Sequence, residues 1–122
     1  MNVLIVEDEP VAQMELERLL KNIDPEINIV DKVDSVEDGI EWFSENQSPD
    51  LVFLDIQLSD GLSFEIFKKV KVVSPVIFTM AFNEYALEAF KLNSIDYLLK
   101  PIEPEDLRQA LDKYRNIRDQ FS

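Results

Sequence analysis

Five short runs of apolar and β-branched residues alternate along the chain with segments in which apolar residues recur at helical spacing. The runs have the length of strands, and the third is apolar on both faces, so both of its faces must be covered. The alternation therefore predicts a single α/β domain: a doubly wound, five-stranded parallel sheet with five helices. The expected strands are residues 2–6, 27–30, 51–54, 75–78 and 97–99, and the expected helices begin near residues 10, 35, 61, 84 and 103.

Local signals indicate several helix boundaries. Pro10 suits the first turn of a helix, and Ser35 with Asp38 three residues later resembles a capping box. Asp60 and Gly61 predict a turn that leads directly into the third helix. Helical spacing predicts inward-facing side chains in the first and last helices, at Met14, Leu16, Leu19, Leu20, Leu107, Leu111 and Tyr114.

The absence of two residue types excludes several functions. The chain has no Cys and no His, which excludes disulfides, thiol catalysis, Ser–His–Asp catalysis and zinc or iron–sulfur sites built on Cys. No apolar run exceeds that of residues 3–6, far short of the roughly 20 residues in a membrane span, and the N-terminus does not resemble a signal peptide. A net charge of −13 opposes binding to nucleic-acid phosphates or anionic lipid. We expect a cytoplasmic domain that binds neither DNA nor membranes directly.

Charged side chains follow three predicted strands at their carboxyl ends. Glu7 and Asp8 follow the first strand, Asp55 the third and Lys100 the fifth. In an open parallel sheet these ends share one edge, where functional groups gather. Two carboxylates about 4 Å apart repel by roughly 4 kcal/mol at an effective dielectric near 20, so such a cluster requires a cation. Oxygen ligands favour Mg²⁺ or Ca²⁺, a lysine can hold an anionic group, and a carboxylate can attack a phosphoryl group. The combination predicts a Mg²⁺-assisted aspartyl-phosphate site.

Each of these residues also has an ordinary structural explanation. Glu7, Asp8 and Glu9 are suitable charges for the positive end of a following helix. A lone aspartate at a strand end, such as Asp55, is commonly a cap or turn residue, and Lys100 could be a surface lysine. Only their joint placement on strands one, three and five favours the functional interpretation.

Three signatures in this order resemble the receiver domain of bacterial two-component response regulators: VLIVEDE at residues 3–9, DLVFLD at 50–55 with Gly61 beyond it, and DYLLKP at 96–101. Residues 81–102, with NEYA at 83–86 and SIDY at 94–97, are similar to the LytTR-type subgroup. The resemblance covers essentially the whole chain. It implies a flavodoxin-like sheet of order 2-1-3-4-5, and a receiver over residues 1–122 whose DNA-binding output domain is absent from this chain.

The resemblance also implies roles for individual residues. Asp55 corresponds to the phosphoacceptor and Lys100 to the lysine that pairs with a phosphoryl oxygen. Asp8 corresponds to a direct Mg²⁺ ligand, Glu7 to one that acts through water, and the Gln57 carbonyl to the backbone ligand. The bond between Lys100 and the following proline is expected to be cis.

The switch position departs from the family pattern. The family has Ser or Thr at the end of strand four, before a small residue, and alignment on Ala81 places Met80 there. Thr79 is one residue earlier, and in a strand it would point to the opposite face. Met80 cannot donate a hydrogen bond to a phosphoryl oxygen. The coupling of Asp55 to Tyr97, the aromatic residue expected to report activation, is therefore in question.

The function expected from these residues is a switch, phosphorylated on Asp55 by a sensor histidine kinase with Mg²⁺, and not a turnover enzyme beyond slow autodephosphorylation. One alternative is a constitutive receiver-like interaction module that Met80 has uncoupled from phosphorylation. Another is an aspartate-nucleophile phosphatase, although Glu7-Asp8 replaces the D-x-D nucleophile motif of that class. A flavin-nucleotide binder is disfavoured, because three acids would repel the phosphate.

A partner surface is also predicted. The expected fourth helix, fifth strand and fifth helix form a face on which a homodimer could assemble. Ordinary core packing would give the same spacing of apolar residues. The residues concerned are Tyr85, Phe90, Leu92 and Tyr97.

Overall fold

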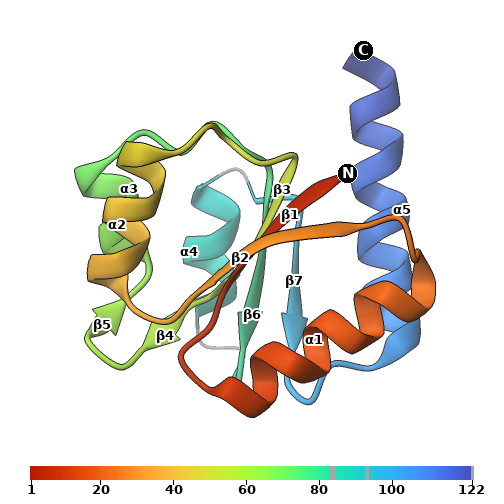
Figure 1. Cartoon of the computed structure of the whole chain (residues 1–122), viewed down its shortest axis with the longest axis horizontal. Helices are drawn as coiled ribbons and strands as arrows, with labels where there is room; N and C mark the ends of the chain where they lie inside the picture. The colour runs from red at the N-terminus through yellow and green to blue at the C-terminus, as the bar shows by residue number, and fades with distance from the viewer. Residues whose placement is uncertain (83–84, 93, 122) are drawn as a thin grey trace.

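The computed structural model describes residues 1–82, 85–92 and 94–121 and contains one five-stranded parallel sheet (Figure 1). Its strands lie in the order β2-β1-β3-β6-β7, which is the predicted order 2-1-3-4-5 when a separate hairpin is set aside. The strands are β1 (Asn2–Val6), β2 (Asn28–Val33), β3 (Leu51–Asp55), β6 (Val76–Met80) and β7 (Asp96–Leu99). All four pairings are parallel, so every strand presents its carboxyl end at the same edge.

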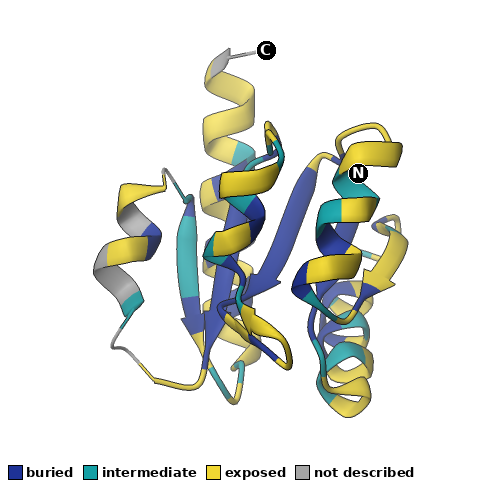
Figure 2. Ribbon diagram, turned by 90° about the vertical axis from the view of Figure 1, so that its left-hand side faces the viewer, coloured by how far each residue is buried: buried dark blue, intermediate teal, exposed yellow. Residues whose placement is uncertain are grey.

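Helices cover both faces of this sheet, as Figure 1 shows. Apolar residues of α1 and α5 pack with one face in a first core cluster, and those of α2, α3 and α4 pack with the other in a second. β3 is buried along its whole length, as expected for a central strand between two helical layers, and Figure 2 shows the buried sheet inside helices with exposed outer faces. The helices are α1 (Pro10–Ile23), α2 (Val36–Glu45), α3 (Phe64–Lys69), α4 (Ala86–Lys91) and α5 (Pro104–Phe121).

The predicted helix signals are largely confirmed. Pro10 begins α1, and the Ser35 hydroxyl accepts a hydrogen bond of 3.0 Å from the Asp38 backbone N–H at the start of α2. Leu107, Leu111 and Tyr114 of α5 are buried. Met14 is an error of the prediction, because it is 65 % exposed. Its spacing from Leu16 places it outside the stripe of α1 that faces the sheet.

The segment after β3 also differs from the prediction. Asp60 and Gly61 do not lead directly into a helix but close a small antiparallel hairpin of β4 (Gln57–Leu58) and β5 (Gly61–Leu62). Gly61 has φ of +144°, a conformation that only glycine adopts without strain. β2 extends to Val33, three residues past its predicted end. The prediction that the fourth helix begins near Glu84 falls at a residue outside the described part, and the described helix begins at Ala86.

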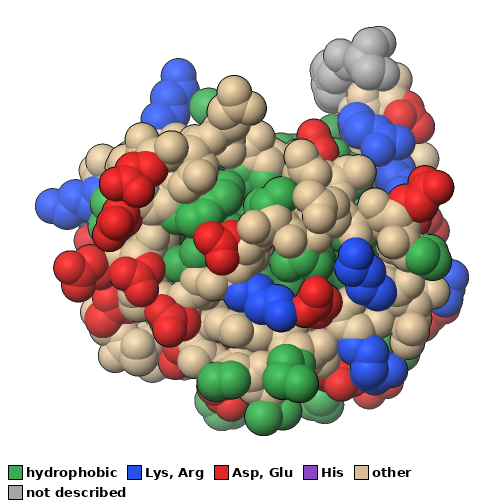
Figure 3. All heavy atoms as spheres, in the orientation of Figure 1, with side chains coloured by type: hydrophobic (Ala, Val, Ile, Leu, Met, Phe, Trp, Pro, Cys, Tyr) green, Lys and Arg blue, Asp and Glu red, His purple; other side chains and the backbone are tan. Residues whose placement is uncertain are grey.

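Charge is distributed unevenly over the surface. Acidic side chains gather over α2 on the left of Figure 3, in agreement with the whole net charge of −13 lying within residues 1–60. In the described part of the chain, no helix combines the length and apolar character needed to cross a membrane.

Candidate functional site

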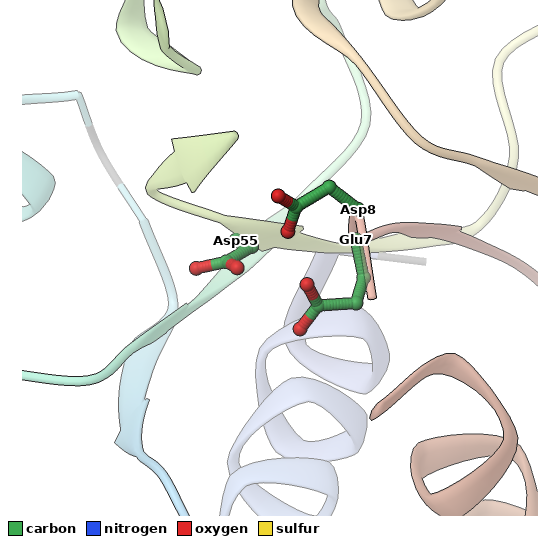
Figure 4. Close-up of side chains that lie close together, drawn as sticks. All are labelled: Glu7, Asp8 and Asp55. Atoms are coloured by element: carbon green, nitrogen blue, oxygen red, sulfur yellow. The ribbon is translucent and has the colours of Figure 1, made fainter. Parts of the chain in front are cut away.

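Three carboxylates converge at the carboxyl edge of the sheet. Glu7 and Asp8 directly follow β1, Asp55 is the last residue of β3, and these two strands are neighbours in register, with Val6 opposite Leu54. One carboxylate oxygen of each residue lies within 4.8 Å of those of the other two. Figure 4 shows the three side chains lying close together. The predicted convergence is confirmed.

Lys100 joins this cluster from the end of β7, the outermost strand on one side of the sheet. It follows β7, which is separated from β3 by β6. Its Nζ donates to Asp55 Oδ2 at 2.8 Å and also to Glu7 Oε1. The peptide bond from Lys100 to Pro101 is cis, as expected. A single ammonium group thus pairs with two carboxylates that are only 4 % and 5 % exposed, which compensates much of the cost of burying them.

The pKa of Asp8 and the pKa of Lys100 are both raised in this cluster. Burial raises the pKa of Asp8, and a hydrogen bond with Glu7 and the charge of Glu7 raise it further, against a smaller opposing effect of Lys100. Burial by itself lowers the pKa of Lys100, but its hydrogen bonds and charge interactions with Asp55 and Glu7 outweigh this, and its pKa is raised. Lys100 therefore stays charged at neutral pH, while burial and the neighbouring Glu7 disfavour the ionised form of Asp8.

A cavity of about 330 Å³ opens beside the cluster. Asp8 and Asp55 line it from the acidic side, and Gln57 lines it from the hairpin. Its oxygen donors suit a hard divalent cation, which takes carboxylates, carbonyls and water. Other lining residues are Met80, Ala81 and Tyr85.

Met80 and Thr79 lie on opposite sides of β6. Met80 is 2 % exposed, packs in the second core cluster and lines the cavity beside Asp55. Thr79 is 3 % exposed and lines a different, mainly apolar hollow of about 270 Å³ against α1. The prediction that Thr79 points to the other face is confirmed, and its hydroxyl is not directed into the acidic cavity.

Residues 3–112 match the family model described as the response regulator receiver domain. The chain belongs to the response regulator receiver family. The predicted family and fold are thus confirmed, and a cluster of Glu7, Asp8 and Asp55 is typical of the Mg²⁺-binding site of a receiver.

Similar proteins agree with this assignment. The receiver is 44 % identical over 118 residues to the sensory transduction protein LytT of Bacillus anthracis, covering 94 % of this chain and 47 % of the relative. It is 38 % identical over 120 residues to the transcriptional regulatory protein LytR of Staphylococcus aureus strain N315, covering 94 % and 47 %. The chain therefore spans about half the length of the curated relatives that it matches. The resemblance to LytTR-type proteins is confirmed.

A solved structure shows the same fold. The response regulatory domain of protein mrkE from Klebsiella pneumoniae superimposes with a TM-score of 0.83 at 34 % identity, covering 98 % of this chain and 99 % of that one.

The predicted partner face is only partly described. Tyr97 of β7 and Tyr85 are half-buried against the second core cluster of the receiver, and the Tyr85 ring makes an edge contact with Phe64. Leu92 is 36 % exposed. The Phe90 side chain and the Asn83-Glu84 motif lie outside the described residues. Dimerisation through this face stays a prediction.

One side-chain contact of the receiver was not predicted from the sequence. Asp60, interpreted only as a turn residue, accepts hydrogen bonds at both carboxylate oxygens from backbone amides of Val36 and Glu37, 2.8 Å and 3.1 Å away. These bonds lower the pKa of Asp60 despite the opposing effect of burial. Its Asp-Gly pair signalled a turn, but no local pattern could show that the carboxylate reaches a helix 24 residues earlier.

Proposed function

We propose that this receiver is a phosphorylation-controlled signalling switch that accepts a phosphoryl group on Asp55. The observation that carries the proposal is the environment of Asp55. Its carboxylate ends β3 at the wall of an open cavity, hydrogen-bonds Lys100 and has Glu7 and Asp8 within 4.8 Å. A nucleophilic carboxylate with a cation-binding cluster and a lysine beside it is the arrangement that phosphoryl transfer requires.

In this proposal Asp8, Asp55 and the Gln57 carbonyl would hold Mg²⁺, and Glu7 would act through water. The bound cation supplies charge neutralisation during transfer. An Asp55 carboxylate oxygen attacks the phosphorus of a phosphohistidine on a sensor histidine kinase, the N–P bond breaks, and the imidazole leaves with the bond electrons and takes up a proton. Lys100, already beside Asp55, then pairs with a phosphoryl oxygen.

The test uses the protein with a small phosphodonor such as acetyl phosphate. We expect intact-mass measurement to show addition of one phosphoryl group in the presence of Mg²⁺ and none when EDTA replaces Mg²⁺. Failure of the wild-type protein to gain this mass would overturn the proposal. Continuous release of phosphate at many turnovers per protein would instead favour the aspartate-nucleophile phosphatase.

Met80 supports a second candidate, a constitutive interaction module. Because Met80 lines the site where a hydroxyl is expected, the bond that would connect a phosphoryl group to β6 is missing. We expect that Met80→Thr enlarges the change in the NMR signals of Tyr97 on phosphorylation. If the Tyr97 signals of the wild type do not change although Asp55 is phosphorylated, the interaction module is favoured. If the signals change equally in both proteins, Met80 does not limit the coupling.

The names of the LytT and LytR relatives support a longer protein in which this receiver controls transcription through a DNA-binding LytTR-type output domain. The proposed location is the cytoplasm, with a sensor histidine kinase as partner. The receiver itself is proposed to bind neither DNA nor membrane, because its net charge is −13.

A further inference from the structure

The hairpin after the acceptor strand is attached at its base and at its tip. At the base, the Ile56 backbone N–H donates to the Thr79 carbonyl at 2.9 Å, and the Ser63 N–H donates to the Ile56 carbonyl at 2.7 Å. The tip is the two-residue connection that ends in Asp60, between Leu58 and Gly61. Gln57, the first residue of β4, lines the acidic cavity between these two attachments.

In the described part of the chain, the side-chain hydrogen bonds that attach this tip to another element are those of Asp60. Its two carboxylate oxygens accept from the first two amides of α2, those of Val36 and Glu37. These amides have no partner within the helix, and the carboxylate also matches the positive end of the helix dipole. Asp60 is an exposed residue, but each of its two carboxylate oxygens accepts a hydrogen bond from a different amide. An asparagine has only one side-chain oxygen and could not replace both acceptors.

The helix to which Asp60 binds is itself held against α3. A Cβ on Gly39 of α2 would lie 2.8 Å from Ile66 Cδ1, so the two helices approach closely at this point. Ile66 is fully buried and belongs to the second core cluster. α2 is therefore a packed support, and the bonds from its amides restrain the hairpin in relation to the core.

We infer that Asp60 is a positioning residue for the metal site, which holds the hairpin so that the Gln57 carbonyl is ready to coordinate the cation. This inference rests on the proposed function. Asp60 does not belong to the carboxylate cluster of Glu7, Asp8 and Asp55, so it acts through the backbone of the hairpin. When supporting bonds already hold a coordinating group in place, the metal binds more tightly, because less of the protein has to become ordered on binding.

The test compares Mg²⁺ binding to variants by titration calorimetry. We expect Asp60→Ala to weaken Mg²⁺ affinity on the order of tenfold, as is usual when a supporting partner of a metal ligand is removed. Asp60→Asn should be intermediate, since its single side-chain oxygen can replace only one of the two acceptors. Amide hydrogen exchange of residues 56–62 without metal should be faster in Asp60→Ala than in the wild type.

Two control variants separate this role from others. Ser35→Ala removes another cap of α2, the bond to Asp38, and leaves the hairpin attached. It should lower the melting temperature but keep wild-type Mg²⁺ affinity and hairpin exchange. Asp34→Asn removes one negative charge after β2, at the same edge of the sheet, and tests for a simple effect of charge.

Each outcome has a distinct meaning. Wild-type protein that does not bind Mg²⁺ would refute the proposed function itself. Tight wild-type binding with unchanged affinity in Asp60→Ala would overturn only the role of Asp60. An equal loss of affinity in Ser35→Ala would overturn it as well, by showing that general stability of α2 is responsible, and an equal loss in Asp34→Asn would do so by showing that charge is responsible.

Discussion

Asp55→Asn is expected to abolish phosphorylation of the receiver, so that its intact mass stays unchanged after incubation with acetyl phosphate and Mg²⁺. The amide has no carboxylate oxygen to attack phosphorus, and no other described acid shares the position of Asp55, which is 5 % exposed, bonded to Lys100 and open to the cavity. The loss should be complete, because the variant removes the nucleophile itself.

Asp34→Asn is the matched control for this experiment. Asp34 follows β2 at the same edge of the sheet but is exposed and stands outside the carboxylate cluster. It should become phosphorylated like the wild type. If Asp55→Asn still gains the mass of a phosphoryl group, another residue is the acceptor and the assignment of Asp55 as phosphoacceptor is wrong.

Lys100→Met is expected to lower the free energy of unfolding by about 2 kcal/mol at neutral pH, because it leaves the buried carboxylates of Glu7 and Asp55 without their ammonium partner. Urea unfolding measures the change. Added Mg²⁺ should restore part of the loss by supplying another cation to the same carboxylates.

The pH dependence of this difference follows from the raised pKa of Lys100, above its ordinary value of 10.5. A group with a raised pKa in the folded state stabilises the protein fully below its unfolded pKa and loses this effect as pH rises through the folded pKa. The stability difference between wild type and Lys100→Met should therefore be constant near neutral pH and narrow only above about pH 10.

Lys32→Met provides the control. Lys32 also pairs with a glutamate, Glu17, but both side chains are about one-third exposed (34 % and 33 %). Water already solvates these charges, so the change should be within about 0.5 kcal/mol. If Lys100→Met lowers the free energy of unfolding no more than Lys32→Met does, Lys100 does not compensate buried charge in the receiver.

Part of the site could be predicted because it depends on order along the chain. Glu7 and Asp8 follow one buried strand and Asp55 ends another, and parallel strands expose their carboxyl ends together. Likewise the opposite directions of Thr79 and Met80 follow from the two-residue period of a strand. The error at Met14 has a different cause: Met14 is two residues from Leu16, which is more than half a turn of a helix, so the two side chains do not share the face that the sheet covers.

By itself, the sequence determined the alternation of strands and helices, the convergence of the three acids and the missing hydroxyl at Met80, because each is a consequence of local periodicity and strand direction. Only the tertiary structure decided which carboxylates Lys100 reaches and which helix Asp60 binds. A long side chain, or a loop carboxylate, finds its partner through the positions of elements distant in the chain: Lys100 and Glu7 are 93 residues apart, and no pattern within a segment specifies such a contact.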